Sequence, residues 1–483
     1  MSVIPVRSKF TMAPALAMLL GFGVMAGILE AQSETAPGRA AESRNMRLVG
    51  HSDLQGRAAY KGEIHKQNGR YLAYIGHHPE TERLNPLTGK MEMSGTSIVD
   101  VTDPANPGYL HHIPAPLYAS GEQICAGDDL PKGERGSHYM LRRTTAKDDN
   151  RHELWDVTDS REPKFMGAVQ DGLVSIHKAW WECSTGIAYL PSQPKGWNGR
   201  GMSIFDLSDP AHPKFIRHFG VPGSQPGHDP AGRRMTELHE ALYLNGRVYM
   251  AYGTSSEGIL QILDNDKLLK GDPNDPYDPV NPTDKQLLYP EIGRLDSPSF
   301  FGVHTAFPML GVELPQYKAW KKGSPRDFVV SVPESTADEC NQPMPHVVTF
   351  VDITDPQHPY PVSNFQVPES PGNFCQRGGR FGTHATNWSF TDVYRNRIVW
   401  ISYFNAGVRG VDVRNPYNPV EVAYYIPAVT EKTIPVSGKA VISTNNVDVD
   451  DRGFVYIFDK NGNGMHILEP TGEAAKIANM PRH

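Results

Sequence analysis

Seven apolar stretches that each end in an aspartate recur along this chain at intervals of roughly 50 to 60 residues. β-Branched and aromatic residues dominate these stretches, and several of them are followed by an Asp-Pro or Asn-Pro turn. Repeated strand-forming segments of this period, separated by Asp, Pro and Gly, are typical of propeller blades. The sequence therefore predicts an all-β fold made of a single seven-bladed β-propeller. The seven aspartates are Asp100, Asp156, Asp206, Asp264, Asp352, Asp412 and Asp459.

The last predicted blade is one strand short. After Asp459, only Met465–Leu468 can form a strand before a polar tail begins. Residues 45–50 precede the first blade and can supply the missing strand, which would leave no exposed sheet edge. The predicted boundaries are a signal peptide at 1–33, a linker at 34–44 and a propeller at 45–483.

The N-terminus resembles a secretory signal peptide. Arg7 and Lys9 precede an apolar stretch at 15–29, and the small residues Ala31 and Ser33 follow it, which fits cleavage after Ser33. An uncleaved membrane anchor is the alternative, although the apolar stretch is short for a full span. We expect a periplasmic or secreted protein that has no transmembrane span after cleavage.

Charge and cysteine content agree with an exported protein. The formal net charge is -7, and we find no clustered basic surface of the kind that binds phosphates, so a nucleic-acid partner is excluded. The four cysteines lack metal-finger spacing and fit an oxidising compartment. We favour a Cys340–Cys375 disulfide between loops on one face. Cys125 and Cys183 remain as the second pair, although the predicted strand placement puts them near opposite faces.

Four of the repeats share a fuller pattern, in which a second proline stands three residues after the first. These second prolines are Pro107, Pro213, Pro359 and Pro419. In this pattern the chain resembles the LVIVD family, a group of secreted bacterial and archaeal proteins named for the same apolar-to-aspartate run. The resemblance covers nearly all of the chain after the predicted signal peptide. It implies a propeller fold but supplies little about function, because function depends on the site.

Histidines recur where the inner strand of a blade is expected to begin. Inner strands converge on the propeller axis, so these side chains should form a ring, and a transition metal is the usual reason to gather neutral imidazoles. Glu63 and Glu237 stand two residues before histidines, on the same face of the strand, and could orient the ligand imidazoles. We predict copper or iron as the cofactor. The five candidate ligands are His65, His177, His239, His304 and His384.

An axial polyhistidine centre is similar to the arrangement in carotenoid-cleavage oxygenases and in the selenium-binding-protein family of methanethiol oxidases. These similarities concern architecture, so no residue role is transferred from either family. A structural role is the alternative, since tryptophan-aspartate repeat propellers use a Gly-His pair inside each blade. Gly302 before His304 and Gly382 before His384 resemble that pair weakly.

Two functional classes remain open. The first is a metal-dependent oxidoreductase or oxygenase that acts on a small molecule and whose pocket is lined by aromatic side chains. The second is a binding scaffold without enzymatic activity that holds a surface protein or a glycan. The five-histidine pattern favours the first class, and the lack of any further catalytic motif favours the second. The candidate pocket aromatics are Trp180, Trp181, Phe300 and Phe301.

Other polar motifs are assigned to turns or to the surface. The repeated aspartates terminate strands and should bond nearby backbone amides in tight turns. The segment 459–464 matches half of a calcium loop, but Pro470 occupies the twelfth position, so a hairpin turn is favoured. His77, His78, His111 and His112 are expected in solvated loops.

Overall fold

A computed structural model describes residues 39–79, 81–228, 235–254, 257–298, 301–342, 344–370 and 372–480. All of them belong to one unit, Thr35–His483. The predicted signal peptide, 1–33, lies outside the described residues. Among the described residues, no helix has the length and apolar character needed to cross a membrane.

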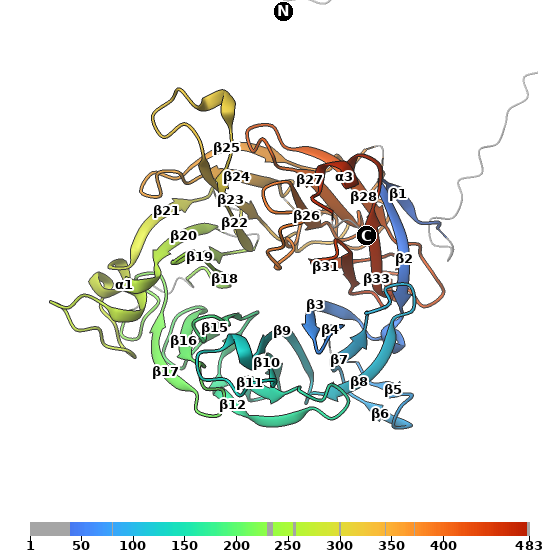
Figure 1. The fold of residues 1–483 in the computed structure, drawn as a ribbon, viewed down its shortest axis with the longest axis horizontal. Coiled ribbons are helices and arrows are strands. Elements are labelled where there is room, and N and C mark those ends of the chain that lie inside the picture. The colour runs from blue at the N-terminus through green and yellow to red at the C-terminus, as the bar shows by residue number, and fades with distance from the viewer. Residues whose placement is uncertain are drawn as a thin grey trace, which may run out of the picture. The chain divides into compact units, whose positions relative to one another are not determined.

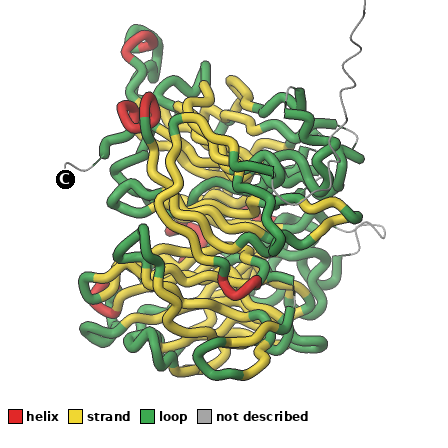
Figure 2. Tube along the Cα trace, turned by 90° about the vertical axis from the view of Figure 1, so that its right-hand side faces the viewer, coloured by secondary structure: helices red, strands yellow, loops and turns green. Residues whose placement is uncertain are grey.

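Strands are the main regular secondary structure of this unit, and they form antiparallel sheets that follow one another around a centre in chain order (Figures 1 and 2). One sheet shows the pattern. β22 (Thr305–Val312) is innermost, and β23 (Arg326–Val332), β24 (Val348–Asp352) and β25 (Tyr360–Phe365) pair in sequence outward from it. The all-β class is confirmed, and the arrangement is propeller-like.

The other four-stranded units, each given from its inner to its outer strand, repeat this order. The first unit is β3 (Ala59–Gln67), β4 (Arg70–His77), β7 (Gly95–Asp100) and β8 (Gly108–Pro114). The second is β9 (Tyr118–Ala126), β10 (His138–Thr145), β11 (Asn150–Asp156) and β12 (Lys164–Leu173). These two units form one eight-stranded sheet, joined at the pair His77 and Ala119. The third is β13 (Ser175–Ile176) with β14 (Trp180–Glu182), then β15 (Ile187–Gln193), β16 (Gly201–Asp206) and β17 (Lys214–Phe219).

The remaining units follow in chain order around the centre in Figure 1. The fourth is β18 (Leu238–Leu244), β19 (Arg247–Tyr252), β20 (Ile259–Asp264) and β21 (Glu291–Asp296). In the unit after β25, the residues around Thr386 lie innermost and pair with β26 (Ile398–Ser402), the second strand of this unit; β27 (Val408–Asp412), β28 (Val420–Ile426) and β1 (Glu42–Arg44) follow outward. The last is β31 (Thr444–Val449), β32 (Val455–Asp459), β33 (Gly464–Pro470) and β2 (Met46–Ser52). Short hairpin strands and helices lie outside these units: β5 (Arg83–Asn85), β6 (Lys90–Glu92), β29 (Pro435–Val436), β30 (Lys439–Ala440), α1 (Asn265–Lys270), α2 (Asp284–Leu288) and α3 (Gly472–Ile477).

The N-terminal strand pairs with the last unit, as predicted for residues 45–50. β2 runs antiparallel to β33, from Met46 opposite Pro470 to Ser52 opposite Met465. The predicted linker at 34–44 needs correction, because its last residues form β1 and pair with β28. Two adjacent sheets therefore each receive their outer strand from the N-terminal segment.

The repeated aspartates form turns, as expected. In six of the seven repeats the carboxylate accepts a hydrogen bond from the backbone amide two residues later, at 2.9 Å in the case of Asp206 and Ser208. The same bond recurs at Asp100, Asp156, Asp352, Asp412 and Asp459. The last of these lies in the hairpin between β32 and β33, so the interpretation of 459–464 as a turn is confirmed. In the remaining repeat, Asp264 accepts from the backbone amide of Lys267 and caps α1.

The proline of the turn contacts the outer strand of the preceding unit. A Cβ atom built on Gly293 in β21 would lie 1.9 Å from the carbonyl oxygen of Pro356, and one on Gly50 in β2 would lie 1.9 Å from that of Pro104. These contacts leave no room for a side chain at either glycine. The recurrence of the Asp-Pro turn is thus explained by packing between units.

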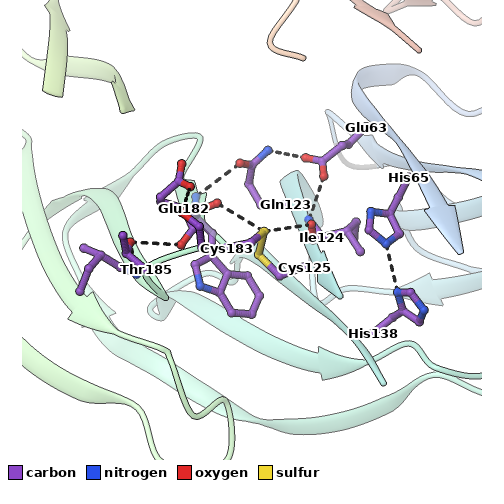
Figure 3. The surroundings of a disulfide bond; sticks show 12 residues. Glu63, His65, Gln123, Ile124, Cys125, His138, Glu182, Cys183 and Thr185 are labelled. Atoms are coloured by element: carbon purple, nitrogen blue, oxygen red, sulfur yellow. Dashed lines mark hydrogen bonds between the residues drawn. A yellow bond between two sulfur atoms is a disulfide. The ribbon is translucent and has the colours of Figure 1, made fainter. Parts of the chain in front are cut away.

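Both disulfides have the predicted pairing, Cys125–Cys183 and Cys340–Cys375. The prediction that Cys125 and Cys183 lie near opposite faces is wrong, because Cys125 stands near the end of β9. Cys183 directly follows β14, which belongs to the inner strand of the next unit. The two cysteines therefore meet at the same end of neighbouring strands (Figure 3).

Candidate metal centre

Three inner strands, β3, β18 and β31, begin with a register irregularity that turns one residue toward the centre of the ring of sheets. In β18, Leu238 pairs with Tyr252 and Glu240 with Ala251, which leaves His239 between them without a partner. Such a bulge re-aims the side chain of the extra residue. The same irregularity isolates Tyr60 in β3 and Asn445 in β31.

Four of the five predicted histidines gather at this level. The imidazole centroids lie 4.8 Å apart for His177 and His239, 5.0 Å for His239 and His304, and 4.5 Å for His304 and His384. His177 and His304 are 5.7 Å apart. Two imidazoles bound tetrahedrally to one ion at the usual metal–nitrogen distance would have centroids about 5 Å apart. The spacing of these neighbouring rings therefore resembles that of rings around a shared ion.

His65 does not join this cluster. The alignment that put it at the start of an inner strand is wrong, because β3 ends at Gln67 and Tyr60 holds the equivalent position. The Nε2 atom of His65 instead lies 3.0 Å from Nδ1 of His138 (Figure 3). Burial lowers the pKa of His65 to about 4, so this pair is neutral at pH 7.

Backbone carbonyls hold three of the gathered imidazoles by Nδ1. The Nδ1–H of His177 donates to the carbonyl of His239 over 2.7 Å, and that of His239 donates to the carbonyl of Glu237 over 3.1 Å. His384 donates in the same way to Asn445. A hydrogen bond at one ring nitrogen fixes the tautomer, so in these rings Nε2 carries the lone pair.

The fourth ring, that of His304, is fully buried and has a free nitrogen. Its Nδ1 lies 3.2 Å from the Thr305 hydroxyl and 3.7 Å from a carboxylate oxygen of Glu240. Its Nε2 is buried without a hydrogen-bond partner among the described residues. An unpartnered buried nitrogen is costly unless something else binds it. Glu240 in turn forms a fully buried ion pair with Lys178.

Glu334 completes a set with metal-ligand spacing. Its carboxylate oxygens lie 3.9 Å from Nε2 of His304 and 3.9 Å from Nε2 of His384. One ligating atom from each of these three residues lies within 4.8 Å of the other two. Sequence reasoning missed Glu334 because it considered only the inner strands, whereas Glu334 follows β23, the second strand of its unit.

Four residues just beyond second strands contact the central residues or lie close to them: His78, Glu334, Phe404 and Lys460. They follow β4, β23, β26 and β32 by one or two residues. Phe404 packs on His384 with ring centroids 5.3 Å apart, and His78 packs on Tyr60 at 5.2 Å. The position after the second strand is thus a sequence signal for residues at the centre.

The two predicted supporting glutamates have other partners. Glu63 accepts hydrogen bonds from the Gln123 side chain and from the backbone amide of Ile124, away from the gathered histidines (Figure 3). Glu237 supports His239 through its backbone carbonyl, while its carboxylate lies 3.2 Å from Arg200.

Burial holds the gathered imidazoles in the neutral form. It lowers the pKa of His304 and of His384 well below the usual range, and the nearby Lys178 ammonium lowers both further. The pKa values of His177 and His239 are lowered in the same direction, first by burial and then by Arg200. Neutral rings with free Nε2 atoms are the form that binds metal ions.

The other predicted surface and pocket residues are placed differently. His77 and His112 are buried in β4 and β8 and share the hydroxyl of Ser97, so their assignment to solvated loops is wrong. Trp180 and Trp181 both line a small cavity with Trp388, and Trp181 also packs in the core. Phe300 lies outside the described residues.

Comparisons with known proteins give no family for this chain. No protein-family model matches it, and no curated protein matches it in sequence. Similar solved structures include the periplasmic gluconolactonase of Pseudomonas aeruginosa (TM-score 0.41, 8% identity, covering 81% of this chain and 98% of that one). Others are BamB from Moraxella catarrhalis (0.40, 8%, 84% and 83%) and hydrazine synthase from Kuenenia stuttgartiensis (0.42, 9%, 86% and 96%). At these TM-scores and identities, the similarities carry no argument about function.

Proposed function

We propose that this chain binds one transition-metal ion at the centre of the ring of sheets, through Nε2 of His304, Nε2 of His384 and the carboxylate of Glu334. The observation that carries the proposal is the mutual spacing of these three ligating atoms, all within 4.8 Å. Ligand atoms around one ion are about 3 Å apart, so binding would draw the carboxylate roughly 1 Å closer to each imidazole.

The scaffold that we propose is a closed, seven-bladed propeller of the LVIVD type, exported to the periplasm or beyond. The repeated four-stranded units and the pairing of β2 with β33 support closure, because that pairing joins the two ends of the described chain. Two disulfides support an oxidising compartment.

The ligand set indicates which metals suit the site. Two imidazoles and one carboxylate with open positions are typical of non-haem iron(II) sites, whereas copper prefers a set richer in nitrogen. His177 would supply that nitrogen, since its Nδ1 is anchored and its Nε2 carries the lone pair. His239 is less available, because Arg200 donates to its Nε2 over 3.3 Å. Iron is thus favoured, with copper as the second choice.

A redox-active ion with open positions would serve a metal-dependent oxidoreductase or oxygenase acting on a small molecule. The protein's contribution is a buried, preorganised ligand set: backbone carbonyls fix the tautomers of His177 and His384, so that their Nε2 atoms are available. Rigid support of this kind reduces the ordering that metal binding would otherwise require.

Metal content tests the proposal. Untagged protein isolated from the periplasm would be analysed by elemental mass spectrometry, alongside a His304→Gln, His384→Gln variant. A His65→Gln, His138→Gln variant is the matched control, because it also removes two neighbouring, largely buried imidazoles. We expect about one equivalent of iron or copper in the wild type and in the control, and none in the first variant.

Two outcomes would overturn the proposal. One is a folded wild-type protein that stays metal-free after exposure to iron(II) and copper(II). The other is equal metal content in the His304→Gln, His384→Gln variant. Circular dichroism of each sample separates loss of metal from loss of fold. A metal-free protein would turn the search to the binding-scaffold alternative and to protein or glycan partners.

A further inference from the structure

Three cations converge on one aromatic ring beside the histidine cluster. The Arg143 guanidinium lies 5.6 Å from the centre of the Tyr60 ring, and the ammonium groups of Lys178 and Lys460 lie 5.8 and 5.9 Å from it. The same ring is 6.2 Å from that of His384. This group of positive charges is therefore adjacent to the proposed metal ligands.

Most charges near the histidines have a partner of opposite sign. Lys178 pairs with Glu240, Arg200 with Glu237 and Arg380 with Glu334. These three pairs cancel in formal charge.

Arg143 and Lys460 differ, because neither forms an ion pair with a carboxylate among the described residues. Arg143 is only 5% exposed and donates to the Ser120 hydroxyl and to the Ile176 carbonyl, both of which are neutral. Burial lowers the pKa of Lys460, and the nearby Arg380 lowers it further. Largely buried cations are rare unless they are paired, so two unpaired positive charges at one place point to an anion that is brought in from outside.

His78 lies among the same cations. Its ring packs on Tyr60 at 5.2 Å and on Tyr118 at 4.3 Å. Its Nδ1 is buried without a hydrogen-bond partner among the described residues. Burial lowers the pKa of His78 to about 2, and the charges of Lys460, Arg143 and Arg380 contribute in that order. Because the His78 imidazole is neutral, the unpaired positive charge at this place belongs to Arg143 and Lys460.

We propose that Arg143 and Lys460 bind the oxyanion group of a small organic acid, carboxylate or phosphate, next to the histidine cluster. A guanidinium offers two parallel donors to such a group, and an ammonium adds a point charge. The organic part would pack against Tyr60, Tyr118 and Phe404, of which Tyr118 lies beside Arg143 while Tyr60 and Phe404 lie beside His384. That this anion is the substrate of the metal site rests on the proposed function; the binding of the anion itself does not.

Titration calorimetry at low ionic strength tests the inference, because salt screens such contacts. The probes are inorganic phosphate and benzoate, added separately to full-length mature protein after dialysis against a chelator, so that a bound ion cannot hold them. The test variants are Lys460→Met alone and Arg143→Gln with Lys460→Met. The control variant is Arg135→Gln with Lys476→Met, which removes the same charges from side chains that are 94% and 77% exposed.

We expect at least one probe to bind the wild type and the control equally, with affinity at least tenfold lower in the double test variant. Lys460→Met alone should weaken binding severalfold, and it guards against misfolding because the Lys460 ammonium makes no hydrogen bond to a described residue. If neither probe binds folded wild type, or if both bind the test variants unchanged, the inference is wrong. Because the titration uses metal-free protein, its failure is distinct from failure of the metal proposal.

Discussion

The Nδ1 atom of His177 lies 2.7 Å from the backbone carbonyl oxygen of His239, so the strand that carries one histidine fixes the tautomer of its neighbour. His384 is held in the same way by the carbonyl of Asn445. In both cases the acceptor belongs to the next unit around the ring. The contact between adjacent sheets thus determines which imidazole nitrogen faces the centre. The arrangement of the sheets therefore decides which nitrogen is available to bind a metal.

Glu334→Gln should weaken metal binding. The substitution keeps the shape of the side chain but removes the negative charge that faces both His304 and His384 at 3.9 Å. We expect the affinity for iron(II) or copper(II) to fall by roughly 10- to 100-fold, a loss typical of weakened coordination. Competition with a chromogenic chelator measures the affinity. Glu237→Gln is the control, because its carboxylate pairs with Arg200; an equal loss in both variants would contradict the ligand assignment.

The fold was largely predictable, because the relevant signals are local. Six of the seven aspartates accept a hydrogen bond from an amide two residues away, so the turn can be recognised from four consecutive residues, as at Asp352 and Thr354. The closing strand was predictable because the last repeat lacked one strand, and β2 pairs with β33 accordingly.

The site was only partly predictable, because it depends on register. His239 reaches the centre by a bulge, whereas His65 lies six residues into β3, and the sequence pattern around the two histidines is alike. Glu334 lies beyond the second strand, where no histidine repeat draws attention. Only the folded structure shows that a residue after the second strand lies beside the histidines at the start of the inner strands.

Replacing Cys125 and Cys183 by serine should destabilise the fold. Their disulfide closes a loop across 58 residues and joins the inner strands of two neighbouring units. Loss of such a cross-link usually costs about 2–4 kcal/mol of unfolding free energy. Urea denaturation followed by tryptophan fluorescence measures the change. The matched Cys340→Ser, Cys375→Ser variant opens a loop of 35 residues and should lose slightly less. An unchanged midpoint in both variants would show that the cross-links do not constrain the unfolded chain.

Gly293→Ala should destabilise the fold far more than the addition of a single methyl group suggests. The new Cβ would lie 1.9 Å from the carbonyl oxygen of Pro356, a backbone atom that cannot rotate away. Relieving such overpacking costs about 1–3 kcal/mol. Gly108→Ala is the matched control, because its Cβ would meet only the Asp100 side chain at 3.8 Å. Thermal unfolding of the two variants compares them; equal melting temperatures would contradict the tight contact between turn and outer strand.

Glu63→Gln should alter the pH dependence of stability. Burial raises the pKa of Glu63 to about 7, since the charged form is poorly solvated there. The folded state therefore binds this proton more tightly than the unfolded state does, and between about pH 4.5 and pH 7 the wild type loses stability as the pH rises. Glutamine has no proton to lose, so from pH 5 to pH 7 the variant should gain about 2 kcal/mol relative to wild type.

Urea denaturation of both proteins at several pH values in this range measures the relative gain of Glu63→Gln. Glu473→Gln, at a side chain that is 56% exposed, serves as the control and should stay parallel to wild type. If the Glu63→Gln curve also runs parallel to wild type, Glu63 titrates normally in the folded protein. Its hydrogen bonds from Gln123 and Ile124 would then offset the cost of burial in full. A gain relative to wild type that grows from pH 5 to pH 7 would instead identify Glu63 as a carboxyl group kept protonated by its surroundings.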